Sequence, residues 1–429
     1  MRERALVDFD DLILLPAELL QREPAIAAEY RRRWPWVSVD EYQDLDDNQY
    51  RLFRHLVASD GHLCAIGDPD QSIYGFRGSN PAIFLQFTRD FLTARVVRLT
   101  RNYRSSQAIV AAALQAIAPS SLVPGRILQS LSENADRISI HTSPTERAEA
   151  EFVVHTIERS IGGSTFFSLD SGRVDTPEVE ARSFADFAVL YRTEAQADSL
   201  VEAFARSGIP FQKKSHRRWT ESPAVQAMLH FLQEAAPHRS PHAPREDSPA
   251  AFSIRPAPAS VTDLLQQAAD AVRAEHPQVP DLLAQLHPLA QRCGDDLSRF
   301  LTELALGADA DSWDPRADRV SLLTLHAAKG LEFPVVFLVG CEDGLLPLRW
   351  GPADNADVAE ERRLFFVGLT RARDRVLLSH ARQRLWRGQV RDMPASPFLE
   401  QIREELLERI QQAQGRRKRR STDNQLQLF

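Results

Sequence analysis

Short apolar runs alternate with helical patterns along roughly the first 118 residues of the chain. The runs at 36–39, 63–66 and 95–99 are each followed by acidic, glycine-containing or polar turn residues. Runs of this length bounded by turn residues predict strands, and the pattern from about Gln107 onward predicts a helix. Strands separated by helices imply a parallel sheet whose functional loops lie at the carboxyl ends of its strands.

A second block of alternating strands and helices begins near Asp186. The pattern predicts a helix over 195–207 that ends at Gly208, because glycine favours the backbone conformation that terminates a helix. The predicted strands of this block are the strongly apolar runs 187–191, 320–325, 335–339 and 375–378.

Two segments of different character interrupt the second block. Six prolines between 237 and 260 predict irregular backbone. Apolar spacing over about 261–306 predicts helices, and it includes Leu264, Leu265, Ala268, Ala269 and Val272. From about Gly415 the chain is polar and charged, which predicts disorder.

Composition narrows the class of protein but not its partner. The 429 residues are 43% hydrophobic and 26% charged, as in a soluble chain of about three domains, and the net charge of −7 gives no sign of a polyanion partner. Cys64, Cys293 and Cys341 form no CxxC pair, which argues against a disulfide framework or a cysteine zinc site and fits a reducing, cytoplasmic location. No apolar run of about 18 residues occurs, so we expect neither a membrane nor a secreted protein.

Asp40 and Glu41 form the first candidate site, because they directly follow the apolar run 36–39. One carboxylate at such a position can hold Mg²⁺ beside a nucleotide, and the second can activate a water. The alternative is that both acids merely favour the start of a helix, and the two interpretations are about equally strong for this motif alone.

The run Gly67–Gly78 is the second candidate. Gln71 can sense a phosphate, Tyr74 and Phe76 can stack on bases, and Arg77 can make a charged contact. A tight turn with two aromatic rings in the core explains the same residues equally well.

Three further patterns carry chemistry-bearing side chains. Tyr103 and Arg104 offer a ring for a purine and a guanidinium for a phosphate. The run 324–333 is a strand that turns at Gly330, and the run 360–373 is a helical stretch with several arginines. Taken singly, the side chains of such runs are more often structural or solvated than functional.

Together, the five patterns occur in the order of the motifs of the UvrD/Rep/PcrA-like superfamily 1 DNA helicases. The acidic pattern resembles the DE-x-QD box of that family, and the glycine-rich run resembles its third motif. The segments 102–105, 324–333 and 367–373 resemble the fourth, fifth and sixth motifs. The resemblance covers about residues 6–235 and 297–380.

The resemblance implies ATP and Mg²⁺ as cofactors and assigns nucleotide-facing roles. Asp40 and Glu41 would be the Mg²⁺ site, with Glu41 activating the hydrolytic water. Gln71 would contact the γ-phosphate and couple it to DNA. The remaining implied nucleotide contacts are Tyr103 on adenine, Glu332 on the ribose, and Arg104 and Arg371 on the transferring phosphoryl group.

The resemblance also implies that the chain binds single-stranded DNA and duplex junctions. Tyr74, Phe76 and Arg77 would face the DNA strand, and His326 and Lys329 would lie near its backbone. Phe76 stands where many relatives carry Trp, a change that keeps the stacking but reduces its area.

The fold implied is α/β, with RecA-like, P-loop NTPase-type parallel sheets: a partial first motor domain, a complete second motor domain and a small helical insert. The implied domains are 1–118 for motor domain 1A, 119–236 with 315–400 for motor domain 2A, 237–314 for a reduced 2B-like insert with its proline-rich linker, and 401–429 for a basic, disordered tail.

One departure from the family pattern concerns ATP binding. A P-loop, G-x-x-x-x-G-K-[ST], occurs nowhere in the 429 residues, although ATP motors of this class require one. We therefore expect a chain truncated or split at its N-terminal side, exposed apolar surface on the first sheet, and little or no ATP binding by the chain alone. A degenerate regulator is the alternative.

The tail ends in Gln425, Leu426, Gln427, Leu428 and Phe429, which resemble the bacterial sliding-clamp-binding peptide. Apolar anchors at the end of a polar tail fit a groove on a partner, although they can instead pack on the chain's own surface. The basic run 416–420 fits either DNA phosphates or a solvated tail.

The prediction is thus an ATP-dependent 3′→5′ DNA helicase or translocase polypeptide of DNA repair or replication. The alternative is a non-catalytic DNA- and clamp-binding helicase remnant. A nuclease has weaker support, because only about 50 residues follow the sixth motif.

Overall fold

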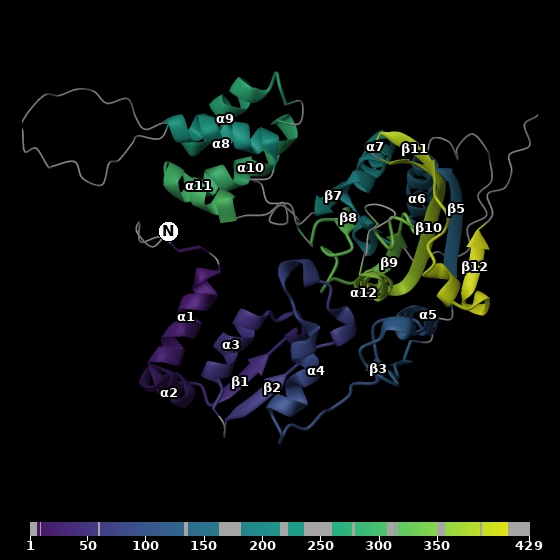
Figure 1. Ribbon diagram of the computed structural model, residues 1–429. Helices are drawn as coiled ribbons and strands as arrows, with labels where there is room; N and C mark the ends of the chain where they lie inside the picture. Colours follow the sequence, from purple (N-terminus) through teal and green to yellow (C-terminus); the bar gives the residue numbers. More distant parts are fainter. Residues whose placement is uncertain are drawn as a thin grey trace, which may run out of the picture. The chain divides into compact units, whose positions relative to one another are not determined.

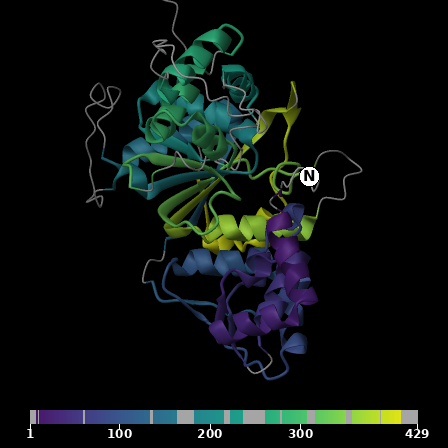
Figure 2. The ribbon, with the colours of Figure 1, turned by 90° about the vertical axis from the view of Figure 1, so that its left-hand side faces the viewer.

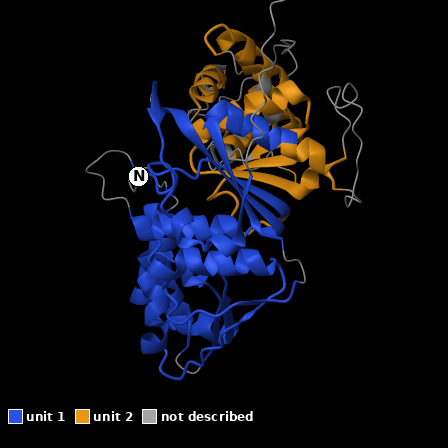
Figure 3. Ribbon diagram, turned by 90° about the vertical axis from the view of Figure 1, so that its right-hand side faces the viewer, with its two compact units in different colours: residues 1–155, 334–429 blue, residues 156–333 orange. Residues whose placement is uncertain are grey.

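The computed structural model describes most of the chain, which divides into two compact units (Figure 3): Met1–His155 with Pro334–Phe429, and Thr156–Phe333. Each unit is described by itself. The described residues are 7–8, 10–58, 61–132, 136–162, 182–214, 222–235, 260–276, 279–306, 314, 316–349, 357–386 and 388–410.

The N-terminal part of the first unit is built on β1 and β2, which pair in parallel with Trp36 opposite His62 and Val39 opposite Ala65. An aromatic core forms around the buried Tyr42 and Phe53. The elements, visible in Figure 1, are α1 (Asp11–Arg22), α2 (Pro24–Arg33), β1 (Trp36–Val39), α3 (Asp47–Leu56), β2 (His62–Ala65) and α4 (Pro81–Asp90).

Side-chain caps fix where the helices of this part begin. Asp46 accepts hydrogen bonds from the backbone amides of Asn48 and Gln49, both at 2.8 Å, and the Gln49 side chain accepts from the Asp46 amide, forming a capping box at α3. Asn80 caps α4 ahead of Pro81.

The strands predicted at 36–39 and 63–66 are confirmed, within one residue at each end.

The strand predicted at 95–99 is wrong. This segment carries no regular secondary structure, and Val96, Val97 and Leu99 expose 63%, 69% and 84% of their surface. A strand exists only when a neighbour completes its hydrogen bonds. Within the described part of the chain no strand besides β1 and β2 belongs to their sheet, so the apolar run has no partner. The sequence analysis expects exposed apolar surface on the first sheet. The segment 95–99 is apolar and exposed, but it is not a strand of that sheet.

The rest of the first unit contains a larger sheet with the strand order β12-β5-β10-β9, in which β5 is parallel to both β12 and β10. The hairpin strand β11 pairs antiparallel to β10. The elements are β3 (Arg101–Asn102), α5 (Gln107–Ile117), β4 (Gln129–Ser130), β5 (Ile138–Thr145), α6 (Glu146–Ser160), β9 (Phe333–Leu338), α12 (Val358–Leu369), β10 (Ala372–Trp386), β11 (Gln389–Asp392) and β12 (Leu407–Ile410).

A buried ion cluster joins the elements of this sheet. Arg384 on β10 donates to Glu149 of α6 at 2.5 Å and to Glu342 at 2.7 and 2.8 Å. Burial opposes the charge of Arg384, but the two carboxylates outweigh it and raise the pKa of the guanidinium. Glu149 also accepts from Ser379 at 2.6 Å, so the buried charges are well hydrogen-bonded.

The second unit has its own parallel strands in the order β6-β8-β7. Its helix α7 ends at Gly208, whose φ of 72° is the left-handed conformation expected of a terminating glycine. The elements are β6 (Phe187–Tyr191), α7 (Ala197–Ser207), β7 (Phe211–Lys214), α8 (Pro223–Ala235), α9 (Val261–Val272), α10 (Val279–Cys293), α11 (Leu297–Leu306) and β8 (Val320–Thr324).

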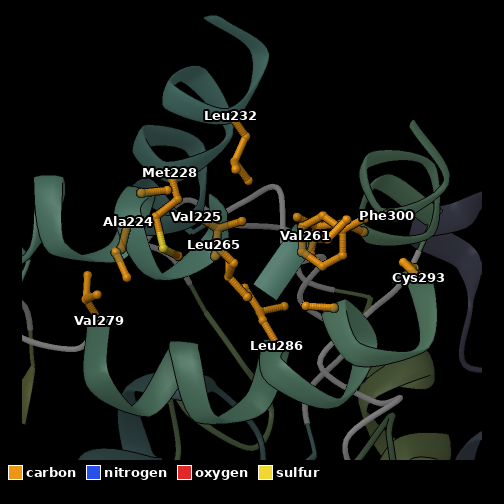
Figure 4. Close-up of a cluster of buried hydrophobic side chains, with 14 residues drawn as sticks. Ala224, Val225, Met228, Leu232, Val261, Leu265, Val279, Leu286, Cys293 and Phe300 are labelled. Carbon is orange, nitrogen blue, oxygen red and sulfur yellow. The ribbon is translucent and has the colours of Figure 1, made fainter. Parts of the chain in front are cut away.

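The predicted helical insert is confirmed as α9, α10 and α11, which pack with α8 around an apolar core (Figure 4). Leu265, Ala268 and Ala269 are buried in this core, and Leu264 and Val272 are partly buried against it. The proline-dense segment lies outside the described residues, apart from Ser260. The disordered tail predicted over 401–429 is wrong for its first ten residues, because β5 supplies a parallel partner for β12 at 407–410 and Leu407 is buried there. Residues 411–429 lie outside the described residues.

The α/β class and the parallel strand arrangement are confirmed. No described helix is long and apolar enough to cross a membrane. Cys64 is exposed on β2, whereas Cys293 and Cys341 are buried.

Candidate functional site

Asp40 and Glu41 occupy the carboxyl end of β1, where both side chains are exposed. Glu41 has φ 50° and ψ 40°, and it is the sole non-glycine residue with positive φ in the described ranges. A non-glycine residue in this region is strained, and such strain is concentrated at functional sites. The Tyr42 amide donates to Ile66 carbonyl oxygen at 2.9 Å, which ties the acidic turn to β2.

A chain of hydrogen bonds leads from the acidic turn to the C-terminal end of α12. The Gln43 side chain donates to the Glu41 carboxylate and accepts from the Asp68 amide at 2.9 Å. Gln71 Nε2 donates to Asp68 Oδ2 at 2.9 Å, and Arg371 Nη2 approaches Gln71 Oε1 at 3.5 Å. The structure therefore brings together Glu41, Gln71 and Arg371, which are separated by up to 330 positions in sequence.

Gly67 allows this close approach. A Cβ atom at this position would lie 2.2 Å from Gln43 Oε1 and 3.0 Å from the Phe84 ring. Glycine is therefore required sterically where the backbone passes the buried Gln43 side chain.

Arg126 anchors the glycine-rich loop through hydrogen bonds to two of its aspartates. It donates to both Asp68 oxygens, at 2.5 and 2.6 Å, and to Asp70 at 3.0 Å. Asp70 is fully buried, and it also accepts from Ser121 at 2.7 Å and from Leu122 amide at 2.6 Å. Burial alone would raise the pKa of Asp68, but the hydrogen bond and charge of Arg126 outweigh burial and lower it.

The aromatic end of the same loop is open to solvent. Phe76 is 66% exposed, and the Arg77 guanidinium lies 5.5 Å from its ring centroid and 5.6 Å from that of Tyr74. Burial, and then the nearby Asp44 carboxylate, raise the pKa of Tyr74. The arrangement combines an exposed Phe76 ring and a half-buried Tyr74 ring with a cation, a combination that suits single-stranded nucleic acid. Phe76 is thus not a core residue.

Tyr103 and Arg104 lie beside the C-terminal end of α12. Tyr103 is 75% exposed, and Arg104 Nη1 is 3.5 Å from the Thr370 carbonyl oxygen. The Ser105 hydroxyl donates to the Ala372 carbonyl oxygen at 2.6 Å and holds this segment in place. Figure 2 shows α12 running alongside α5, the helix that follows this segment.

Arg371 is buried, with 2% of its surface exposed, and its Nε donates to the Val367 carbonyl oxygen at 3.0 Å. Arg104 and Arg371 therefore lie at the same end of α12. Two guanidinium groups at this end of the helix, one of them in contact with Gln71, are suited to stabilise a polyanion.

His326, Lys329 and Glu332 belong to the second unit, in and just after the turn that follows β8. Gly330 has φ 82°, which permits the turn predicted there. Glu332 lines a cavity of about 280 Å³ together with Arg319, Gln212 and other residues of the same unit. The turn thus presents a half-buried carboxylate at a small cavity.

Sequence reasoning missed Gln43, Asp68 and Arg126 as individual site residues. Gln43 and Asp68 lie inside the motifs that resemble the family, and their polar side chains between apolar strands were a usable signal. Arg126 follows a glycine turn far from either motif, so no local pattern marks it.

The two carboxylates at the acidic turn fit a Mg²⁺ ion whose other ligands are phosphate oxygens and water. Nowhere in the described ranges do three His, Cys, Asp or Glu side chains form a group that could hold a metal alone. Magnesium in nucleotide sites is held by one or two carboxylates with phosphate oxygens and water. Asp40 and Glu41 can supply the protein's part of such a site.

Comparison with known proteins identifies the chain as a helicase and places it in a helicase family. The sequence profile of the UvrD/REP helicase N-terminal domain matches residues 1–92, and that of the UvrD-like helicase C-terminal domain matches 97–243 and 260–383. The chain therefore belongs to the UvrD-like helicase family, as the order of its motifs predicted.

Its similar relatives include ATP-dependent DNA helicase PcrA of Leuconostoc citreum, 30% identical over 94% of this chain, and that of Bacillus subtilis, 29% identical over 94% of this chain. The chain spans 61% and 62% of the length of these two proteins. One solved structure is described as the C-terminal domain of a possible DNA helicase from Lactobacillus plantarum. It is 13% identical in sequence, and the match covers 72% of this chain and 98% of the solved chain. Its TM-score of 0.32 is too low to support an argument.

Proposed function

We propose that this chain is part of an ATP-dependent 3′→5′ DNA helicase or translocase that acts in DNA repair or replication. The observation that carries the proposal is the hydrogen-bonded chain from Glu41 through Gln71 to Arg371. It connects the groups that would bind and hydrolyse a nucleotide to the loop that bears the exposed Phe76. The 3′→5′ polarity and the cytoplasmic location follow from the family resemblance and composition.

In the proposed motor, Asp40 and Glu41 would hold Mg²⁺, and Glu41 would also orient and deprotonate the attacking water. The metal, when bound, neutralises charge on the phosphates. Gln71 senses the γ-phosphate, and Arg104 and Arg371 stabilise the negative charge that develops during phosphoryl transfer. Tyr103 stacks on the adenine ring, and Glu332 contacts the ribose.

The proposed DNA site of the first unit consists of Tyr74, Phe76 and Arg77. For His326 and Lys329 of the second unit, the family resemblance supports a role near the backbone of the strand. Stacking on aromatic rings tolerates any base sequence, which suits a translocating motor. Single-stranded DNA next to duplex junctions is therefore the proposed ligand. The 1A, 2A and 2B-like domain boundaries inferred from the sequence stay a prediction.

The second candidate is a non-catalytic helicase remnant that binds DNA and a sliding clamp. The 429 residues lack the backbone cradle and lysine that would hold the β- and γ-phosphates. We propose that this chain alone does not hydrolyse ATP, whichever candidate holds.

The test measures binding and hydrolysis by the same preparation. The chain should bind fluorescein-labelled oligo-dT, and Phe76→Ala should weaken binding about tenfold, as expected for one stacking ring. ATP hydrolysis with saturating oligo-dT should remain at background. Robust turnover that Glu41→Gln abolishes would show instead that the chain is a complete ATPase.

Genomic DNA upstream of the Met1 codon distinguishes the two candidates. An in-frame sequence encoding G-x-x-x-x-G-K-[ST] supports the motor, whereas a stop codon and a ribosome-binding site directly before Met1 support the remnant.

The proposed clamp contact uses Gln425, Leu426, Leu428 and Phe429, which lie outside the described residues. Deleting 425–429 should abolish co-purification with a bacterial sliding clamp while oligo-dT binding stays unchanged. Clamp binding that survives the deletion would refute this contact.

A further inference from the structure

Helix α12 and the segment just after it contact the glycine-rich loop at three positions. Near the C-terminal end of the helix, Arg371 approaches Gln71 at 3.5 Å. One turn in from the N-terminal end, the buried Arg363 donates from Nε to the Ser72 carbonyl oxygen at 2.8 Å. In the first turn, Glu360 Oε1 accepts from the Gly75 amide at 3.0 Å.

The contact between Glu360 and Gly75 is unusually close. A Cβ atom on Gly75 would lie 2.4 Å from Glu360 Oε2, and all three of its nearest neighbours would be atoms of the Glu360 carboxylate. Glycine at 75 therefore makes room for this one side chain. The contact immediately precedes Phe76 and Arg77, the exposed end of the loop.

The start of α12 fixes the direction of the Glu360 side chain. Asp357 caps the helix by accepting from the Ala359 and Glu360 amides at 3.0 and 3.1 Å. Burial raises the pKa of Glu360, while the Gly75 amide and the Arg363 charge act in the opposite direction. The half-buried carboxylate thus lies between the helix and the loop.

We propose that Glu360 is a positioning residue for DNA binding: it holds the Gly75 backbone on α12 and thereby sets the orientation of Tyr74, Phe76 and Arg77. This inference rests on the proposed function of the loop. Because Arg371 lies at the other end of the same helix, Glu360 also makes the DNA-facing segment move with the nucleotide-facing arginine.

The first experiment compares affinities for fluorescein-labelled oligo-dT by anisotropy in the full chain. Glu360→Ala should weaken binding about five- to twentyfold, since it removes a hydrogen bond to a charged acceptor from the loop. Glu360→Gln keeps a carbonyl acceptor for the Gly75 amide and should stay within about twofold of the natural chain. Glu400→Ala, on an exposed side chain of the same unit, is the matched control and should change nothing.

Amide hydrogen exchange supplies a readout that a general loss of stability would not give. In Glu360→Ala, exchange should accelerate over residues 73–78 while β10 and α5 keep their protection. Uniform acceleration across the unit would mean that Glu360 acts on folding and not on the loop.

A double-mutant cycle tests the contact itself. Gly75→Ala should weaken oligo-dT binding in the natural chain, because the new Cβ displaces the carboxylate. In the Glu360→Ala background the same substitution should cost little further affinity, since the clashing atoms are gone. Additive losses would overturn the proposal.

The outcomes separate this inference from the proposed function. If the natural chain does not bind oligo-dT, the proposed DNA site fails. If the natural chain binds and Glu360→Ala binds equally well, the DNA site stands and the role of Glu360 is refuted. Equal losses in Glu360→Ala and Glu360→Gln would also refute it.

Discussion

Arg126 and its two aspartates show how a single cation can hold a functional loop. Its partners Asp68 and Asp70 lie 58 and 56 positions earlier in the chain, and Asp70 is fully buried. Removing the guanidinium would leave a buried carboxylate without its charge partner, which costs more than the pair contributes.

Replacing Arg126 with Met should lower the free energy of unfolding by about 3–5 kcal/mol at pH 7. The pKa of Asp68 is lowered in the folded state, so its stabilising contribution is complete above its unfolded pKa of about 4 and is lost as pH falls through the folded value. The difference between the two proteins should therefore shrink below about pH 4. Urea unfolding at pH 7 and pH 3 measures both effects.

Arg89→Met is the control for this measurement, because Arg89 is exposed on α4 and its loss should change stability by less than about 0.5 kcal/mol. An Arg126→Met protein that is as stable as the control would show that the loop does not depend on this ion pair.

Residues that follow a strand in a recognisable motif were predictable from sequence, and residues that meet through the fold were not. The position of Asp40 and Glu41 at the end of β1 could be predicted because an apolar run precedes them. Arg126 was missed because its partners are distant in sequence, and Glu360 because its acceptor role depends on the Gly75 backbone, 285 positions away.

Two apolar segments of similar pattern differ in whether a neighbouring strand pairs with them. The strand β6 has five fully buried residues and lies at 187–191, as predicted from its apolar run. The segment 95–99 has a similar apolar pattern but lacks a neighbouring strand among the described residues. The apolar pattern of a segment predicts its tendency to form a strand. The strand itself also needs hydrogen bonds to a second segment, which the pattern does not specify.

Amide exchange should report this difference directly. Residues 95–99 should exchange at nearly the rate of an unstructured peptide, since their amides lack strand partners, and residues 187–191 should be strongly protected. Mass-spectrometric hydrogen exchange on the native chain makes the comparison in one sample. Slow exchange at 95–99 would indicate that the segment is paired in solution.

For the whole molecule, the question is which ligands it can hold. The chain spans about three fifths of the PcrA relatives, 61% and 62%, and its sequence lacks a P-loop. The proposed DNA-facing rings and cation are present in one short loop, so DNA binding and ATP binding need not be retained together. The net charge of −7 says little about either, because the relevant groups are few and local.

Thermal unfolding separates the two ligands. Saturating oligo-dT should raise the midpoint by roughly 2–4 °C, because a ligand that binds the folded state stabilises it by mass action. Millimolar Mg²⁺-ATP should change it by less than about 1 °C, since weak binding adds little stabilisation. A larger shift with ATP than with DNA would contradict the predicted loss of nucleotide binding.

The different burial of the three cysteines makes the chain suitable for site-specific labelling. Cys64 is exposed on β2 opposite Ser38 of β1, whereas Cys293 and Cys341 are buried, and burial raises the pKa of both thiols. A maleimide fluorophore should add once to the native chain and three times after denaturation, as intact mass would show. The label at Cys64 would then report, by its emission, any polypeptide that docks beside the β1–β2 sheet.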